Sequence, residues 1–323
     1  MSANADKEVW KAKYIALLDK PTLEEAQLPE AQALKIHNAP SFLYRYRRFS
    51  ENTNSELLNS YIWLSHPDDF NDPFDSALLI SEEVLLKKSF KARPELLLER
   101  VWAFLTDDER RTVRSSEQPF NTAWDILRAK GMIAVPISSE EAFETFMKEC
   151  RASDKEAGYI PFAALKNNIR IGCFSENSSS VLMWSHYAQN HTGICIEYDT
   201  QELFKQREMK LFLNPVIYKA KRFDLTHHLD PVGMRDPNVI GPILASCHKS
   251  PDWSYEKEWR LVVPVRPWDK DQKFRMDTKP SRILVGVKAG SARLEEIRAL
   301  AAKISVPISV GEMSETTFAI TFK

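Results

Sequence analysis

The sequence predicts an α+β fold with small mixed or antiparallel sheets, a helical insertion and N-terminal helices. Residues 81–168 carry leucine and phenylalanine at the spacing of amphipathic helices. The second half contains several short strand-like segments with few long helices between them, which favours α+β over a doubly wound sheet. We therefore expect a helical extension over residues 1–40, a core formed by residues 41–80 and 169–323, and the insertion over residues 81–168.

The composition argues against several classes of protein. The 323 residues include 44 Lys and Arg against 45 Asp and Glu, a balance that argues against a general electrostatic binder of nucleic acid. The sequence has 9 glycines and lacks the glycine-rich motifs of Rossmann and P-loop proteins. No apolar run reaches the ~18–20 residues of a membrane span, so we expect a cytoplasmic protein with no membrane partner.

Cysteine and histidine spacing does not predict a metal site. The 4 cysteines are far apart in the sequence, and in a reducing compartment they are expected to be buried thiols. His227 and His228 are neighbours, but no second pair of ligands with suitable spacing accompanies them. The sequence therefore predicts no metal ligands.

Residues 41–48 (SFLYRYRR) predict a strand that follows the N-terminal helices. Because side chains alternate along a strand, Tyr44 and Tyr46 are expected on one face, with Arg45 and Arg47 on the other.

The segment HPDDFNDPFDS that begins at His66 predicts an ordered loop, because its prolines exclude a helix or a central strand. We expect Phe70 and Phe74 to anchor this loop to the body of the protein. Two interpretations remain for its polar residues Asn71, Asp72 and Asp75: a well-packed turn, or a rim over a cleft.

A second polar group follows the strand predicted at residues 171–175. The serines at 178–180 are expected to cap a helix over residues 181–190, and a buried strand follows at GICIEYD. Ser175, Ser185, His186 and Tyr187 lie around this junction between strand and helix. They are candidate site residues, although a histidine such as His186 is also compatible with a position near the core.

The stretch SPDWSYEKEWR at residues 250–260, which continues into Leu261, predicts a strand with two carboxylates two residues apart. Glu256, Glu258 and Arg260 would share one face, and Trp259 would lie on the opposite face, toward the core. Two acids and an arginine in a row are costly to bury unless they line a cleft. The alternative is a face exposed to solvent.

Six motifs resemble one widespread bacterial and phage family, known as domain of unknown function 2971. They are LYRYR (43–47), FNDPFD (70–75), CFSE (173–176), MWSHYA (183–188), GICIEYD (193–199) and YEKEWRLV (255–262). The resemblance covers roughly residues 41–290, and the bacterial and phage setting suggests a toxin or a phage-defence effector. The family implies no activity.

A second resemblance proposes chemistry. The order of Arg45, then Ser185 to Tyr187, then Glu256 and Glu258 is similar to that in ADP-ribosyltransferases of the diphtheria and cholera toxin type. Those enzymes are α+β folds built on two small sheets. The middle element departs from their pattern, because it is predicted on a helix and lacks the usual Ser-Thr-Ser.

This resemblance implies a transferase or glycohydrolase that uses NAD as its substrate. Glu258 would hold the ribose hydroxyls and Glu256 would deprotonate the acceptor, a protein or nucleic acid. Arg45 would bind the pyrophosphate. His186 completes the catalytic candidates, and the residues expected to bind the nucleotide are Arg45, Tyr44, Asn71, Ser175, Trp184, Ser185 and Tyr187.

Two other functions fit the same residues. Asp72, Asp75, Glu256 and Glu258 could surround a divalent ion in a nuclease or another phosphodiester hydrolase, with His186 as acid or base. A charged and aromatic cleft could also bind a nucleotide without catalysis, as a sensor. Metal dependence and turnover of NAD distinguish the three.

Overall fold

The computed structural model describes residues 2–77, 79–157, 166–229, 240–266 and 273–323. Within these residues, eight strands form one sheet in the order β12-β11-β10-β4-β1-β3-β8-β5. All neighbours in this sheet are antiparallel except β10 and β11. The predicted α+β class with mixed or antiparallel strand pairing is confirmed. Instead of the expected small sheets, however, most strands join one eight-stranded sheet.

The strands of this sheet are short, as the sequence suggests. In sheet order they are β12 (Ile320–Phe322), β11 (Ile308–Met313), β10 (Arg282–Val285), β4 (Ile194–Asp199), β1 (Phe42–Arg47), β3 (Ile169–Ser175), β8 (Glu258–Pro264) and β5 (Leu213–Pro215). Two further strand pairs are β2 (Tyr61–Trp63) with β9 (Lys273–Arg275), and β6 (Ile217–Tyr218) with β7 (His248–Lys249).

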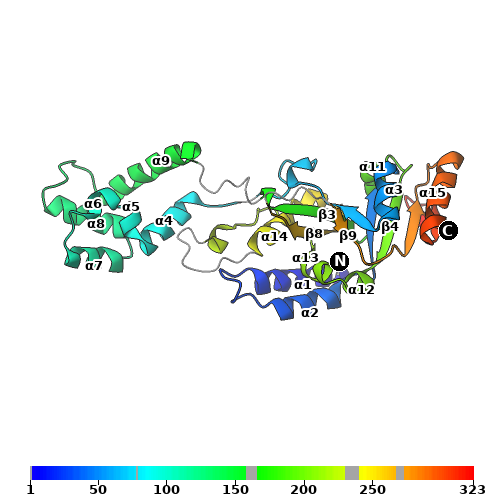
Figure 1. Cartoon of the computed structure of the whole chain (residues 1–323), viewed down its shortest axis with the longest axis horizontal. Helices are drawn as coiled ribbons and strands as arrows, with labels where there is room; N and C mark the ends of the chain where they lie inside the picture. The colour runs from blue at the N-terminus through cyan, green and yellow to red at the C-terminus, as the bar shows by residue number, and fades with distance from the viewer. Residues whose placement is uncertain (1, 78, 158–165, 230–239, 267–272) are drawn as a thin grey trace.

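Helices surround the sheet. They are α1 (Ser2–Leu18), α2 (Leu28–Asn38), α3 (Glu51–Leu58), α11 (Val181–Tyr187), α12 (Thr200–Leu203), α13 (Arg207–Phe212), α14 (Gly241–Ser246) and α15 (Ser291–Ile304). Three 3-10 turns, η1 (Pro67–Asp69), η2 (Thr226–His228) and η3 (Pro251–Glu256), complete the loops. In Figure 1, α1 and α2 lie along one side of the strands, and α15 lies at the end of the molecule that carries the C-terminus.

One face of the sheet supplies the main apolar core. Leu43 of β1, Phe174 of β3 and Trp259 of β8 belong to one buried cluster, together with Ile297 and Leu300 of α15. The tyrosine face of β1 belongs to a second cluster, in which Tyr46 contacts Trp184. The alternation expected for residues 41–48 is therefore present: leucine and arginines on one face, tyrosines on the other.

The segment from 82 to 157 consists of helices joined by short connections. It contains α4 (Glu82–Ala92), α5 (Pro94–Leu97), α6 (Glu99–Trp102), α7 (Asp107–Ser115), α8 (Pro119–Ala129) and α9 (Ser139–Ala157). These helices gather at one end of the molecule, away from the sheet (Figure 1). They bury a cluster of their own around Phe90 and Phe120. The predicted end of the insertion, near residue 168, follows residues 158–165, which lie outside the described part of the chain.

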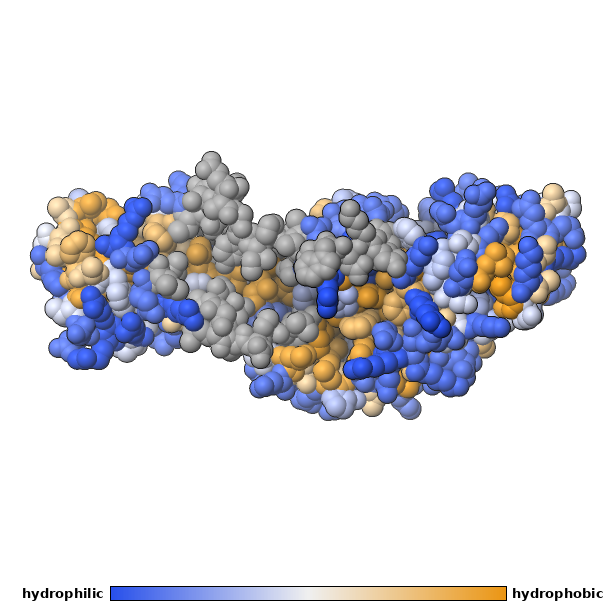
Figure 2. All heavy atoms as spheres, viewed as in Figure 1, coloured by the Kyte–Doolittle hydropathy of each residue, from blue (hydrophilic) through white to orange (hydrophobic). Residues whose placement is uncertain are grey.

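The face of the molecule drawn in Figure 2 is mostly hydrophilic. Figure 2 shows charged and polar side chains over much of this face, with apolar side chains exposed on the helical end and near the centre. None of the helices in the described ranges is both long and apolar enough to cross a membrane.

A buried lysine joins α2 to the sheet. Lys35 is 1% exposed, and its Nζ donates to the carbonyl oxygens of Lys210 (2.9 Å) and Leu213 (2.8 Å) and to Oδ1 of Asn214 (3.2 Å). Burial disfavours the charged amine and lowers the pKa of Lys35 to about 7. Above about pH 7 the folded protein therefore prefers the neutral amine, which has two N–H donors for these three acceptors. The unfolded chain keeps the lysine protonated up to its ordinary pKa of about 10.5.

This difference predicts a pH dependence of stability. Between about pH 7 and pH 10 the unfolded chain binds the extra proton, so the free energy of unfolding should rise with pH by about 1.4 kcal/mol per unit. Lys35→Met should remove this slope, because the variant has no amine to titrate. Urea unfolding of both proteins at a series of pH values measures the effect; parallel pH profiles would contradict it.

Candidate functional site

A cavity of about 230 Å³ lies where the central sheet parts between β1 and β3. In the part of the chain that the structure describes, these two strands share a single register pair, Tyr44 with Ser175. On their other edges, β1 pairs with β4 over its whole length, and so does β3 with β8. Beyond Tyr44 the two strands diverge, so residues 45–47 and 171–174 line the cavity from opposite sides.

The wall formed by β1 carries excess positive charge. Arg45 and Arg47 share the carboxylate of Glu56 on α3: NH2 of Arg45 lies 3.9 Å from it, and Arg47 donates a short hydrogen bond to it. Arg45 is 3% exposed, and its guanidinium lies over the ring of Phe174 at 5.3 Å. Its Nε and NH1 have no hydrogen-bond partner among the described residues. A buried donor of this kind is costly unless a ligand supplies the acceptor.

The opposite wall carries Glu256, which accepts from two side chains. Tyr187 of α11 donates its hydroxyl to Oε1 of Glu256 at 2.7 Å, and Nζ of Lys249 donates to Oε2 at 2.6 Å. The Ser175 hydroxyl donates to the backbone carbonyl of Glu256 at 2.6 Å, which fixes the position of the residue. Lys249 also lies over the ring of Trp253, at 4.8 Å from its centre.

Glu258 belongs to a second, fully buried part of the network. Its Oε1 accepts from Nε of Arg260 (2.8 Å), and its Oε2 accepts from NH2 of Arg260 (3.0 Å) and from Lys249 (3.2 Å). Arg260 also donates to both carboxylate oxygens of Asp75, at 2.7 and 2.6 Å, and to the carbonyl of Ser246 at 2.7 Å. All five N–H groups of this guanidinium are therefore used.

The surroundings shift the pKa values of the two glutamates in opposite directions. Burial, then the neighbouring Glu258, raises the pKa of Glu256, and Lys249 and Tyr187 offset only part of this. Burial also opposes ionisation of Glu258, but Arg260 and Lys249 outweigh it and lower the pKa of Glu258 to about 2. Glu258 is thus a permanent anion bonded to cations, whereas Glu256 is the acid that can hold or release a proton. Two carboxylates with separated pKa values are a common feature of acid–base sites.

The backbone separates these two acids in a way that the sequence pattern does not reveal. The prediction of one continuous strand through Glu256 is wrong: η3 ends at Glu256, and β8 begins at Glu258. Lys257 between them has φ 43°, in the left-handed region that non-glycine residues seldom adopt. This corner lets both carboxylates reach the same Lys249 Nζ. The predicted common face of Glu258 and Arg260, with Trp259 opposite, is present.

The structure brings together part of the predicted set. Four of the nucleotide-binding candidates line the cavity, namely Tyr44, Arg45, Asn71 and Tyr187. Both predicted catalytic glutamates, Glu256 and Glu258, line it as well.

Four candidates lie outside the lining. Trp184 is fully buried in the core and donates Nε1 to the carbonyl of Ser178 at 2.7 Å. Ser185 bonds to His191 at 2.9 Å, and the Ser175 hydroxyl bonds to the backbone of Glu256 and of Asn177. His186 is exposed, and its ring lies beside that of Tyr187 with centres 6.2 Å apart. The helix α11 turns His186 away because its Met183 and Tyr187 side already faces the cavity.

The loop from His66 to Ser76 is held differently from the prediction. Phe74 is 67% exposed and anchors nothing, whereas Phe70 lies under the guanidinium of Arg260 at 5.4 Å. Asp72 accepts from the backbone N–H of Phe74 at 2.9 Å, as expected for a turn. The main anchor is the ion pair between Asp75 and Arg260 described above.

Several lining residues were missed by sequence reasoning. Lys249 lies on the two-residue strand β7, and no sequence motif surrounds it. Its role is visible only in the structure, where it pairs with the buried Glu256 and Glu258. Arg47 was assigned to the correct face but to no role. Cys173 also lines the cavity; burial and the charge of Glu258 raise its pKa well above the ordinary value, so it is a protonated thiol and a poor nucleophile.

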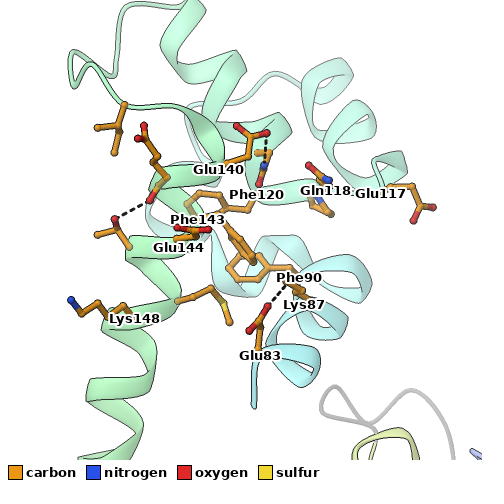
Figure 3. Close-up of a pocket in the computed structure, with 16 residues that line it drawn as sticks. Glu83, Lys87, Phe90, Glu117, Gln118, Phe120, Glu140, Phe143, Glu144 and Lys148 are labelled. Carbon is orange, nitrogen blue, oxygen red and sulfur yellow. Dashed lines mark hydrogen bonds and ion pairs between the residues drawn. The ribbon is translucent and has the colours of Figure 1, made fainter. Parts of the chain in front are cut away.

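A larger cavity, of about 1070 Å³, lies in the helical segment between α4, α8 and α9. Figure 3 shows Phe90, Phe120 and Phe143 at its base and Glu117, Glu140 and Glu144 around it. Its glutamates are all exposed to solvent. It lacks the buried, charged side chains that the smaller cavity has, so we assign the candidate site to the cavity between β1 and β3.

The fold and the site thus define an α+β protein with a buried charge network at a parted sheet. A family model described as "Protein of unknown function (DUF2971)" matches residues 183–261. The matched range includes Tyr187, Lys249, Glu256, Glu258 and Arg260, and leaves out β1 and the loop that contains Asp75. The resemblance to this family is confirmed over that range. No curated protein and no solved structure matches the chain.

Proposed function

We propose that the cavity between β1 and β3 binds NAD and that the protein cleaves the bond between nicotinamide and ribose. One observation carries this proposal: a buried arginine whose Nε and NH1 have no acceptor among the described residues and a glutamate with a raised pKa face the same cavity. The arginine suits a phosphate group, for which a guanidinium provides paired donors. The glutamate suits proton transfer, because its raised pKa makes it a stronger base than an exposed carboxylate.

The size of the cavity suggests how the substrate is divided. Ligand sites usually enclose about 300–1,000 Å³, and about 230 Å³ is closer to one sugar and its base than to a whole dinucleotide. We assign the nicotinamide riboside half to the cavity, the pyrophosphate to Arg45 and Arg47, and the adenosine half to the outside of the cavity.

The proposed reaction uses Glu256 as the base. The bond between C1′ and nicotinamide breaks, and its electron pair returns to the pyridine nitrogen, which neutralises the positive charge of that ring. Water or an acceptor hydroxyl forms the new bond to C1′, and its proton passes to Glu256. Tyr187 orients this carboxylate through its hydrogen bond at 2.7 Å. The oxygens of Glu258 are bonded to Arg260 and Lys249, so we give Glu258 the role of positioning these cations rather than of binding ribose hydroxyls.

The experiment is release of nicotinamide by the purified full-length chain, measured by chromatography in EDTA, with and without protein or nucleic acid as acceptor. We expect release in EDTA, because the acids of this site are bonded to Lys249 and Arg260 and need no metal. Binding of NAD without release would indicate a sensor. Cleavage of nucleic acid that EDTA abolishes, with no effect on NAD, would support the phosphodiester hydrolase instead.

Arg45→Met should weaken NAD binding without a comparable loss of rate at saturation. Methionine keeps much of the length of the side chain but removes the guanidinium N–H donors. Because the pyrophosphate loses these hydrogen bonds, we expect the affinity for NAD to fall by about 10- to 100-fold. The pyrophosphate contact exists before and during the reaction, so the rate of bound substrate changes less. Calorimetric titration and saturation kinetics give both values.

The matched control for this variant is Arg48→Met. Arg48 follows the same strand but is exposed and does not line the cavity. Equal affinities of the Arg45 variant and the wild type would remove Arg45 from the binding site.

A further inference from the structure

A second cluster of potential ligands lies outside the cavity, where α1 meets η2. Nε2 of His227 lies 2.6 Å from Oδ1 of Asp19, and Nε2 of His228 lies 2.8 Å from the same oxygen. One ligand atom from each of the three residues lies within 4.8 Å of the others. In the described ranges of the chain, no other set of three His, Cys, Asp or Glu residues meets this condition.

We propose that Asp19, His227 and His228 form a binding site for a divalent transition metal, with zinc as the expected ion. Two imidazole nitrogens and one carboxylate oxygen are a frequent donor set for zinc, and they suit it better than calcium or magnesium, which prefer oxygen ligands. The sequence predicted no metal site because the histidine pair lacked a further ligand. The fold supplies this ligand from residue 19.

Neighbouring residues hold the two imidazoles in place. The ring of Phe223 packs against both of them, with centres 6.5 Å from His227 and 5.6 Å from His228. Gly241 at the start of α14 approaches His228 so closely that a Cβ there would lie 2.8 Å from its Cγ. The turn itself is fixed by Asp224, which accepts from the backbone N–H of Thr226 at 2.9 Å. The donors are therefore positioned before any ion binds.

The exposure of the three side chains fits a site that is open on one side. The side chain of His228 is 1% exposed, whereas those of Asp19 and His227 are 30% and 41% exposed. An ion can enter from this side, and water can complete a tetrahedral shell there. In such a shell, bonds of about 2.0–2.1 Å separate neighbouring ligand atoms by about 3.3 Å. The Asp19 oxygen would need to move about 0.5–0.7 Å further from the two nitrogens, which a small rotation of its partly exposed carboxylate would allow.

A metal at this site would join the N-terminal helices to the part of the chain that carries the cavity. Asp19 directly follows α1, and the chain after η2 leads to α14 and β7. Ser246 of α14 accepts a hydrogen bond from Arg260, and Lys249 of β7 bonds to both glutamates. The site is nevertheless separate from the proposed chemistry, so its test does not depend on NAD.

The test is titration of the metal-free, full-length chain with zinc in competition with a chromophoric chelator. The affinity tag is removed beforehand. We expect one equivalent to bind and the melting temperature to rise with zinc. Cobalt should give the visible absorption of a four-coordinate ion. A chain that takes up no zinc in competition with the chelator would overturn the proposal.

Variants separate a metal site from a simple hydrogen-bonded cluster. Asp19→Asn keeps an oxygen that can accept from both histidines but removes the charge, and His227→Ala removes a partly exposed ligand. We expect each to lower zinc affinity at least about tenfold, with circular dichroism unchanged in the absence of metal. His186→Ala is the control, because His186 is exposed and outside both sites. Unchanged zinc affinity in both cluster variants would overturn the proposal.

Discussion

Replacing Glu256 with Gln is expected to lower the rate of nicotinamide release by about 10²–10³-fold while NAD binding changes little. Glutamine preserves the shape of the side chain and can still accept from Tyr187, but it cannot take a proton from water or an acceptor. Burial and Glu258 raise the pKa of Glu256, so the wild-type carboxylate is a stronger base than an exposed one. The measurement is single-turnover release of nicotinamide at saturating NAD.

Two further variants make this result specific. Glu24→Gln changes an exposed glutamate far from the cavity and should leave the rate unchanged. Tyr187→Phe removes the hydroxyl that orients Glu256 and should give a smaller loss than Glu256→Gln, because the base itself remains. A Glu256→Gln protein that releases nicotinamide at the wild-type rate would refute the assigned base.

Arg260→Met should destabilise the folded protein by about 3–5 kcal/mol. Arg260 is 1% exposed and pairs with Asp75 and Glu258, which are themselves buried. Without the guanidinium, Lys249 would be left near three carboxylates. Removal of one partner from a buried ion network is costly because the remaining charges cannot reach water. Urea unfolding measures the loss.

The compensating variant tests whether charge, and not packing, causes this loss. Adding Asp75→Asn and Glu258→Gln to Arg260→Met removes the two uncompensated charges and should recover a large part of the stability. Arg298→Met on α15, whose exposed arginine pairs with Glu295, should change stability by less than about 1 kcal/mol. A loss no greater than that of the Arg298 variant would show that the network contributes little to stability.

Local patterns were sufficient to predict most of the fold. Alternation placed the tyrosines and arginines of β1 on opposite faces, and the polar pattern identified Ser180 as a cap, which accepts from the N–H of Met183. Helical spacing identified α4, α8, α9 and the stretch that contains α5 and α6, but not α7. The joining of strands from both ends of the chain into one sheet could not be predicted in this way, because strand pairing depends on contacts between distant residues.

Site residues could be predicted from the sequence only where a charged residue lay within a strand. Arg45 and Glu258 lie on strands, and their alternation was informative. Three other features depend on tertiary packing, which produces no periodic pattern in the sequence. They are the left-handed conformation of Lys257, the position of Lys249 and the contact of Asp19 with the two histidines. The error at Phe74 has the same origin: a phenylalanine in a polar loop suggested an anchor, but the ion pair of Asp75 with Arg260 already holds that loop.

The single register pair between β1 and β3 has a mechanical consequence. Each wall of the cavity belongs to its own continuous hydrogen-bond ladder, β1 with β4 and β3 with β8, so either wall can move as a rigid body. A rotation about the Tyr44 and Ser175 pair changes the width of the opening without breaking either ladder. Both walls contribute residues to one apolar cluster on one face of the sheet, and such a rotation would have to preserve this packing. Only one register pair of the described strands thus joins the two ladders through the backbone, and further contacts across the opening come from side chains, such as Arg45 over the ring of Phe174.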